Sequence, residues 1–284
     1  MKFAAIINPM SRSVPEGGPD VLEAELRAAG HDLVSLACDP GNLLADVRKA
    51  ADSEAEAVIA WGGDGTLACT LTACGASGPP VLALPGGTMN MLPHRLHGQE
   101  AGWQEVLENV LRKPVVQTIG AGEAEGERFY VAALFGRMTA LAGSREAVRK
   151  GDLLDAAQTL MEGGVLDVET RLRVTSRHRS GEQLINAVAA AVVVSGSDVP
   201  ALEMAAIDPE STLDLLGTAI DAMIHGWKNA EPVERDISRS ITIHDLSNSR
   251  IPATLDGEQV SFKTPVRIRM IDDAARVLRA GAGS

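Results

Sequence analysis

The sequence predicts two domains: an α/β domain with a parallel sheet over residues 1–116, and a mostly antiparallel β domain over residues 117–284. Up to about residue 115, short apolar runs of strand length alternate with helical segments, which is the pattern of a parallel sheet covered on both faces. Beyond that point, most predicted strands are separated only by short turns or polar loops. Roughly the last twenty residues are left open to pack back on the first domain.

In the first domain, apolar runs indicate the strands and capping residues indicate the helix starts. Asp20 and Asn42 are of the type that caps a helix. The predicted strands are Phe3–Ile7, Leu33–Ala37, Ala57–Trp61 and Val81–Leu84, and the predicted helices are Val21–Ala29, Leu43–Ala51, one starting near Leu67, and Gly102–Leu111. Ligands of such sheets bind at the carboxyl ends of the strands. We therefore expect the loops at Asn8, Gly62 and Gly86 to converge on one crevice.

In the second domain, strands dominate. The predicted strands are Val115–Ile119, Phe129–Ala133, Val168–Val174, Leu184–Val194, Ser240–His244, Ile251–Leu255 and Val266–Met270, with helices over about Met138–Lys150, Leu153–Met161 and Thr218–His225. Because Leu184–Val194 is almost wholly apolar, we expect it to be a central strand.

The composition limits the classes of function. The chain carries 38 acidic against 26 basic residues, a net charge of −12, which argues against sequence-blind nucleic-acid binding. It also argues against adsorption on an anionic membrane by net charge, although a local basic patch stays open. Three cysteines without a CxxC pair fit a reducing compartment. No apolar run approaches the length of a membrane span, so we expect a cytoplasmic protein.

The segment Gly62–Thr66 reads Gly-Gly-Asp-Gly-Thr and follows a buried-strand pattern. A strand, a glycine-rich turn and a helix start form a phosphate site, because the backbone can approach an anion whose charge the helix dipole favours. Asp64 would repel phosphates, so we expect it to act through a metal ion or to orient the nucleotide or an attacking hydroxyl. The alternative is a tight turn without a ligand.

Four short motifs in order resemble the diacylglycerol kinase catalytic-domain family, which includes bacterial lipid kinases, sphingosine kinases and ceramide kinase. They are Asn8-Pro9-x-Ser11, Gly62–Thr66, Pro85–Asn90 (Pro-Gly-Gly-Thr-Met-Asn) and Leu255–Glu258 (Leu-Asp-Gly-Glu). The motifs span almost the whole chain. The resemblance implies a nucleotide-binding α/β domain followed by a β-sandwich-like domain. It also implies transfer of the γ-phosphoryl group of ATP to a lipid hydroxyl, with Mg²⁺.

The resemblance also implies residue roles. The ATP-binding residues would be Asn8, Ser11, Gly62, Gly63, Asp64, Gly65, Thr66, Thr88 and Asn90. The catalytic residues would be Asp64, Asp256 and Glu258, with one of the last two as general base. Taken alone, the Asp-Gly pair at residues 256–257 is equally a plain hairpin turn.

Two further sites follow from the resemblance. A second metal would be bound by Asp208, Glu210 and Asp214, although Glu210 stands where the family has aspartate. Met91 and Leu92 would form a wall for acyl chains. The expected partner is a lipid substrate at a membrane surface, with no nucleic acid. A position at the inner face of the membrane and a homodimer stay open, as does the choice among acceptors such as diacylglycerol and a sphingoid base.

Two alternatives remain. NAD kinase shares a Gly-Gly-Asp-Gly loop and a related two-domain plan, but its typical Asn-Glu pair is missing after the second motif region. A nucleotide-binding sensor without catalysis is the other alternative. It is supported by departures from the family pattern at Ala37, Met91 and Glu210. Turnover of ATP by the purified protein separates a kinase from a sensor.

Overall fold

A computed structural model describes residues 1–39, 42–98, 101–136, 171–178, 181–187, 189–195, 200–207 and 234–281. The chain divides into two compact units, Met1–Gly120 with Asp272–Ser284 and Ala121–Ile271. The predicted helices Met138–Lys150, Leu153–Met161 and Thr218–His225 lie outside the described residues. Within the described part, no helix is both long and apolar enough to cross a membrane.

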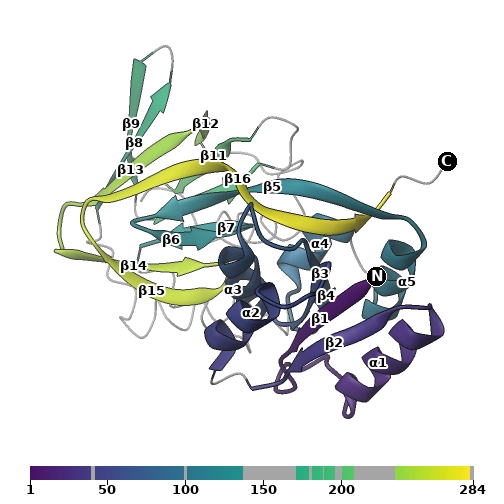
Figure 1. Ribbon diagram of the computed structural model, residues 1–284. Coiled ribbons are helices and arrows are strands. Elements are labelled where there is room, and N and C mark those ends of the chain that lie inside the picture. Colours follow the sequence, from purple (N-terminus) through teal and green to yellow (C-terminus); the bar gives the residue numbers. More distant parts are fainter. Residues whose placement is uncertain are drawn as a thin grey trace. The chain divides into compact units, whose positions relative to one another are not determined.

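The N-terminal unit is built on a parallel sheet with the strand order β2-β1-β3-β4 (Figure 1). Its strands are β1 (Lys2–Ile7), β2 (Asp32–Ala37), β3 (Ala57–Gly62) and β4 (Val81–Pro85). Its helices are α1 (Gly18–Ala28), α2 (Leu43–Ala51), α3 (Asp64–Cys74), α4 (Met91–His97) and α5 (Trp103–Arg112). All residues of β3 and β4 are buried, as expected for strands covered on both faces.

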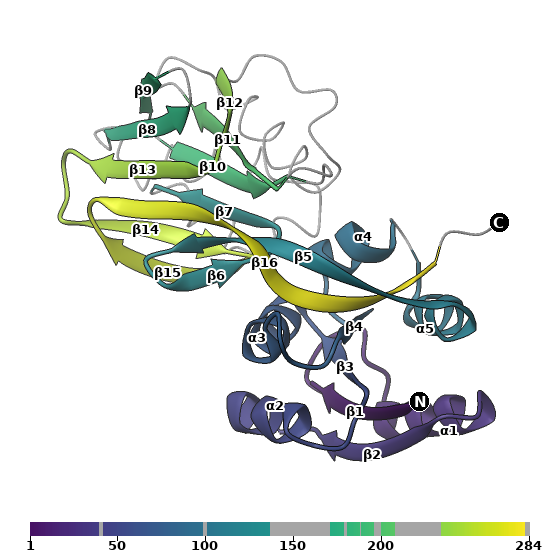
Figure 2. The same ribbon diagram turned by 45° about the horizontal axis from the view of Figure 1, so that its top comes forward.

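The two faces of this sheet are covered by different helices. Alternate residues of β1, such as Phe3, pack in one cluster with Leu22 of α1 and Val106 of α5. Helices α2 and α3 contact each other and lie side by side (Figure 2), and they pack on β1 and β3 respectively. The first domain therefore has the layered α/β architecture that the sequence predicts.

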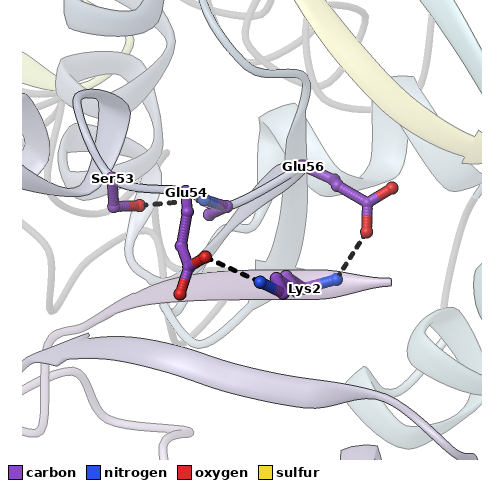
Figure 3. Close-up of polar contacts among 5 residues, drawn as sticks. Lys2, Ser53, Glu54 and Glu56 are labelled. Carbon is purple, nitrogen blue, oxygen red and sulfur yellow. Dashed lines mark hydrogen bonds and ion pairs between the residues drawn. The ribbon is translucent and has the colours of Figure 1, made fainter.

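A polar cluster fastens the start of β1 to the segment that enters β3 (Figure 3). Lys2 Nζ lies 2.6 Å from Glu54 Oε2, and the backbone N–H of Lys2 donates to Glu56 Oε2 at 2.8 Å. Ser53 Oγ accepts from the N–H of Ala55 at 3.2 Å. Because Lys2 and Glu54 are exposed, the ion pair contributes little to stability. The N–H of Glu56 also donates to Lys2 O at 2.8 Å, next to the parallel pairing in which Phe3 lies opposite Ala57.

Two local features of this unit differ from expectation. Helix α3 begins at Asp64 rather than near Leu67, so the glycine-rich motif forms the first turn of the helix. Helix α4 was not predicted, because Pro93 falls inside it and it has only seven residues.

The C-terminal unit consists of two mostly antiparallel sheets. One contains β8 (Leu172–His178), β9 (Gly181–Ala187), β13 (Ser240–Asp245), the start of β16 (Val266–Ala280), the end of β5 (Pro114–Ala124) and β6 (Glu127–Phe129). The other has the order β12-β11-β10-β7-β14-β15 and contains β7 (Ala132–Phe135), β10 (Ala189–Val194), β11 (Leu202–Ile207), β12 (Glu234–Ser238), β14 (Arg250–Leu255) and β15 (Glu258–Lys263).

The two sheets of this unit share one hydrophobic core. Ile243 and Ile268 of the first sheet belong to the same buried cluster as Val192 and Ala253 of the second. This confirms the predicted fold class, an α/β domain followed by a β-sandwich. The last strand also serves the other unit, because Val277 of β16 pairs in parallel with Val81 of β4.

Two predicted strands were wrong in extent. Leu184–Val194 is not one central strand: β9 ends at Ala187 and β10 begins at Ala189, and the two belong to different sheets. Leu184 is 57% exposed, so part of this apolar run has a wet face. Phe129–Ala133 is not one strand either, because the chain bends at residues 130–131 between β6 and β7. An apolar run does not reveal where a chain changes sheet.

Candidate active site

Three loops meet at the carboxyl ends of the parallel strands, after β1, β3 and β4. The N–H of Ser13 donates to the carbonyl of Gly86 at 2.9 Å, and the N–H of Gly86 donates to the carbonyl of Gly62 at 3.0 Å. Asn8, the first residue after β1, donates its N–H to Trp61 O at 2.9 Å. Direct backbone bonds therefore hold the three predicted loops together.

Close backbone contact explains several of the motif glycines. A Cβ on Gly86 would lie 3.0 Å from Gly62 Cα, and a Cβ on Gly87 would lie 2.9 Å from Gly63 Cα. A Cβ on Gly62 would collide with Thr66 at 2.9 Å. These three glycines are required by the fold itself.

Gly63 is different, because the fold leaves room for a side chain there. A Cβ on Gly63 would find its nearest neighbours, Gly87 Cα and Ser11 Oγ, at 3.9 Å, an ordinary contact distance. Its backbone is extended, with φ −77° and ψ 170°, which any residue adopts. Gly63 is also the N-cap of α3 and brings no side-chain hydrogen bond to the helix start. A glycine at this position fits a ligand that must come close to the backbone.

Asn8 and Ser11, the predicted site residues in the loop after β1, bond to their own loop and to the start of α3. Asn8 Oδ1 accepts from the N–H of Met10 at 3.0 Å, and Asn8 Nδ2 donates to Thr66 Oγ1 at 3.3 Å. Ser11 Oγ accepts from the N–H of Gly63 at 3.1 Å. Both residues therefore fix the loop after β1 against the start of α3, at Gly63 and Thr66.

Asp64 joins the starts of two helices. It is the first residue of α3, and its carboxylate accepts from the N–H of Met91 at 3.2 Å and from the N–H of Leu92 at 2.9 Å. The charge thus lies at the N-terminal turns of both α3 and α4, where helix dipoles stabilise an anion. This contact gives Asp64 a structural task that sequence reasoning did not find. Its predicted action through Mg²⁺ stays a prediction.

The loop Pro85–Asn90 is closed by its own last residue. Asn90 adopts φ +48°, and its Oδ1 accepts from the N–H of Gly87 at 2.8 Å. Thr88 is exposed in the middle of the loop. Met91 and Leu92 are buried, 7% and 0% exposed, so they leave little side-chain surface for an acyl chain. The predicted acyl-chain contact remains untested.

In the C-terminal unit, Asp256 and Gly257 form a two-residue hairpin between β14 and β15. Both have positive φ, 46° and 89°, and Leu255 pairs with Glu258 across the turn. The sequence alternative of a hairpin at residues 256–257 is therefore what the backbone adopts.

The carboxylate of Asp256 binds a bend of the chain far away in the sequence. Its Oδ2 accepts from the N–H of Tyr130 at 2.6 Å, and its Oδ1 accepts from the N–H groups of Val131 and Ala132, each at 2.9 Å. Asp256 is 5% exposed. These bonds explain why β6 and β7 are separate strands. They also occupy three of the roughly four lone-pair sites of the carboxylate, which leaves little capacity for a general base.

Glu258 differs from Asp256 in its surroundings. It is the first residue of β15 and is exposed. Of the two predicted carboxylates, Glu258 therefore has the more accessible oxygens. The metal ligands Asp208, Glu210 and Asp214 lie outside the described residues. Among the residues that are described, no group of three or more His, Cys, Asp or Glu side chains could hold a metal ion.

A cavity of about 420 Å³ lies beside α4 and α5, with His97 and Arg279 in its lining. His97 Nε2 donates to Ala83 O at 3.1 Å. Burial, and secondly the positive charge of Arg279, lower the pKa of His97 from 6.5 to about 4. The imidazole is therefore neutral at physiological pH.

The lowered pKa of His97 predicts that the N-terminal unit loses stability in acid. The pKa of His97 is about 4 in the folded chain and 6.5 in the unfolded chain. Between pH 4 and pH 6.5, the unfolded chain therefore binds a proton that the folded chain does not. Stability contributed by neutral His97 is complete above pH 6.5 and is lost as the pH falls toward 4, up to about 3 kcal/mol. We expect His97→Gln, which can still donate to Ala83, to lose less stability than wild type over this range in urea unfolding. Parallel pH profiles would contradict this.

Comparison with known proteins shows which family the N-terminal part of the chain resembles. Residues 2–122 match the family model of the diacylglycerol kinase catalytic domain. This confirms the resemblance for the three motifs at Asn8–Ser11, Gly62–Thr66 and Pro85–Asn90, whereas the motif Leu255–Glu258 lies outside the matched residues. The crystal structure of a diacylglycerol kinase from Bacillus anthracis str. Sterne is similar with a TM-score of 0.71 and 18% identity, covering 98% of this chain and 96% of that one.

The fold is also shared more widely. The crystal structure of an NAD kinase from Archaeoglobus fulgidus in complex with ATP has a TM-score of 0.54 and 13% identity, and covers 99% of this chain and 94% of that one. At such identities these two structures support the fold alone. The family match over residues 2–122 supports a kinase.

Proposed function

We propose that this protein is a lipid kinase that transfers the γ-phosphoryl group of ATP to a lipid hydroxyl. The observation that carries nucleotide binding is Gly63, a glycine that the fold does not require at the N-cap of an 11-residue helix. The first turn of a helix has N–H groups without intrahelical acceptors, and the helix dipole favours an anion there. The backbone at residues 63–66 is thus suited to hold phosphates.

The lipid acceptor is supported by the family. The domain match is to diacylglycerol kinases, and a solved structure of similar fold has that name. A lipid hydroxyl is the acceptor that this family name implies. Identification of the lipid that becomes labelled by γ-labelled ATP distinguishes a diacylglycerol from a sphingoid base.

The reaction needs a proton acceptor. The lipid hydroxyl oxygen forms a bond to the γ-phosphorus while the bond from that phosphorus to the β–γ bridging oxygen breaks, which releases ADP. The hydroxyl proton passes to a carboxylate, and we assign this role to Glu258. The three hydrogen bonds that Asp256 accepts make it the less suitable base.

Mg²⁺ is proposed as the companion of ATP. When bound, it neutralises charge on the phosphates. We propose that the phosphates of ATP supply ligands to the ion. Mg²⁺ commonly keeps several waters and uses few protein carboxylates.

NAD is the second candidate acceptor, because the chain shares its fold with an NAD kinase that was solved with ATP. One experiment separates the two. The purified protein is incubated with Mg²⁺ and ATP labelled in the γ-phosphoryl group, once with a total lipid extract and once with NAD. We expect label in an organic-soluble lipid phosphate and none in NADP. Label in NADP would replace the lipid assignment, and ATP binding without turnover would favour the sensor.

A further inference from the structure

A turn of the C-terminal unit presents a leucine to solvent. Leu246 is 44% exposed in the turn between β13 and β14. Hydrogen bonds within the turn fix its backbone, because the carboxylate of Asp245 accepts from the N–H groups of Ser247 and Asn248 at 2.8 and 2.9 Å. The N–H of Leu246 donates to Arg171 O at 2.9 Å. The backbone that carries the exposed leucine is therefore held in place by hydrogen bonds.

Four cations surround this turn. Arg171 is bonded to Leu246, and Arg173 on β8 is the cross-strand neighbour of His244. Arg250 at the start of β14 pairs with Lys263 at the end of β15. All four side chains are exposed. We call Leu246 and these four residues, Arg171, Arg173, Arg250 and Lys263, the basic turn cluster.

Backbone bonds place these segments together. The N–H of Asp245 donates to Thr264 Oγ1 at 2.9 Å, and the N–H of Thr264 donates to Ser249 O at 3.1 Å. The turns that follow β13 and β15 are therefore neighbours, and both views show them at the same end of this unit (Figures 1 and 2). The backbone segments that carry the cluster therefore lie at one end of the C-terminal unit, where Arg250 also donates from Nε to Ser261 Oγ at 3.0 Å.

Among the described residues, the carboxylates near the cluster do not cancel these charges. Within residues 171–178 and 240–269, as far as the structure describes them, the acids are Asp245, Asp256 and Glu258. Asp245 is 3% exposed and bonded within its turn. Asp256 and Glu258 lie at the opposite end of the β14–β15 hairpin, about 17 Å from Lys263 at 3.3 Å per residue. Glu125 is exposed and accepts from the backbone N–H of Arg267 at 2.8 Å.

We propose that the basic turn cluster docks this unit on an anionic membrane surface, with Leu246 entering the interfacial layer and the four cations contacting lipid phosphates. The proposal rests on the proposed function, since a lipid kinase must reach its substrate in a bilayer. The net charge of −12 repels such a surface, so this local cluster would set the orientation of approach. Charge attraction together with a small apolar insertion is how peripheral proteins bind reversibly.

Vesicle co-sedimentation of the full chain tests the surface. The probes are vesicles of phosphatidylglycerol mixed with phosphatidylcholine, and vesicles of phosphatidylcholine alone. We expect binding to the anionic vesicles that weakens as salt is raised. Each basic residue near such a surface contributes about fivefold, so Arg173→Glu with Lys263→Glu should weaken binding by roughly 30-fold or more. Leu246→Asp should weaken it by about tenfold.

Matched controls keep the test sharp. Arg48→Glu with Lys49→Glu makes the same charge change on exposed positions of α2, and Leu184→Asp makes the same apolar-to-acid change at another exposed leucine. Both controls should bind like wild type. Equal loss in a control, equal binding to neutral vesicles, or a cluster variant that alters only self-association would overturn the proposal.

The two proposals can fail separately. In detergent-dispersed lipid, where no charged bilayer is present, we expect the cluster variants to phosphorylate lipid at the wild-type rate. Cluster-dependent vesicle binding without any lipid phosphorylation would contradict the proposed function and leave the docking surface standing. Lipid phosphorylation by a protein whose cluster variants bind vesicles normally would contradict the docking surface alone.

Discussion

Asp256→Asn is expected to lower the free energy of unfolding by about 2–3 kcal/mol, whereas Glu258→Gln is expected to change it by less than about 0.5 kcal/mol. Both changes turn a carboxylate into an amide of the same shape. At position 256 the new NH₂ group would face the N–H of Tyr130 or those of Val131 and Ala132, which now donate to the carboxylate. Asparagine tolerates the positive φ of this position, so backbone strain does not confuse the result.

Turnover is expected to rank the two variants in the opposite order, with the larger loss in Glu258→Gln. Loss of a general base costs 10²–10⁴-fold in turnover as a typical range, so Glu258→Gln should lose about that factor at unchanged stability. Urea unfolding and ATP turnover at a temperature where both variants are folded are the measurements. Normal turnover by Glu258→Gln would remove it as the base, and full stability of Asp256→Asn would contradict the anchoring of the 130–132 bend.

Gly63→Ala and Gly87→Ala are expected to fail in different ways. The Cβ at position 63 meets only ordinary contacts at 3.9 Å, so stability should be kept. The same methyl group would stand where we propose that ATP phosphates approach, so the dissociation constant for ATP should rise at least about tenfold. At position 87 the Cβ would lie 2.9 Å from the backbone of Gly63. That variant should lose about 1–3 kcal/mol of stability.

Isothermal titration with ATP and urea unfolding of both variants measure these effects. Gly102→Ala is a suitable control, because its Cβ would meet only a side-chain oxygen, of Gln104, at 3.9 Å. If Gly63→Ala binds ATP as well as wild type, the phosphates do not approach this backbone. If it unfolds as easily as Gly87→Ala, the glycine is structural after all.

The layered fold could be predicted because its signals are local. Apolar runs such as Ala57–Trp61 and Val81–Leu84 have the length of buried strands, and the structure places both inside the parallel sheet. The loops that follow them were recognisable by their glycines. The Asp-Gly pair at 256–257 was open to a hairpin interpretation, and its two positive φ angles are those of a hairpin turn.

Other features could not be predicted because they depend on contacts between distant segments. Asp256 bonds backbone groups 124–126 residues earlier in the chain, and Asp64 bonds the start of a helix 27 and 28 residues later. Backbone N–H groups carry no residue-type signal, so no motif shows which of them donate to these carboxylates. The basic turn cluster likewise joins residues 171–173, 246–250 and 263. These become neighbours only after β8 has paired with β13 and β14 has paired with β15.

The central claim is that phosphates of ATP bind at residues 63–66 and that the γ-phosphoryl group passes to a lipid. The most direct measurement is a single reaction in which the purified protein receives γ-labelled ATP, Mg²⁺, a lipid extract and NAD together. We expect the label in a lipid phosphate monoester, with Gly63→Ala forming that product only at raised ATP concentration. Label in NADP, release of inorganic phosphate alone, or a Gly63→Ala variant that needs no more ATP than wild type would contradict the claim.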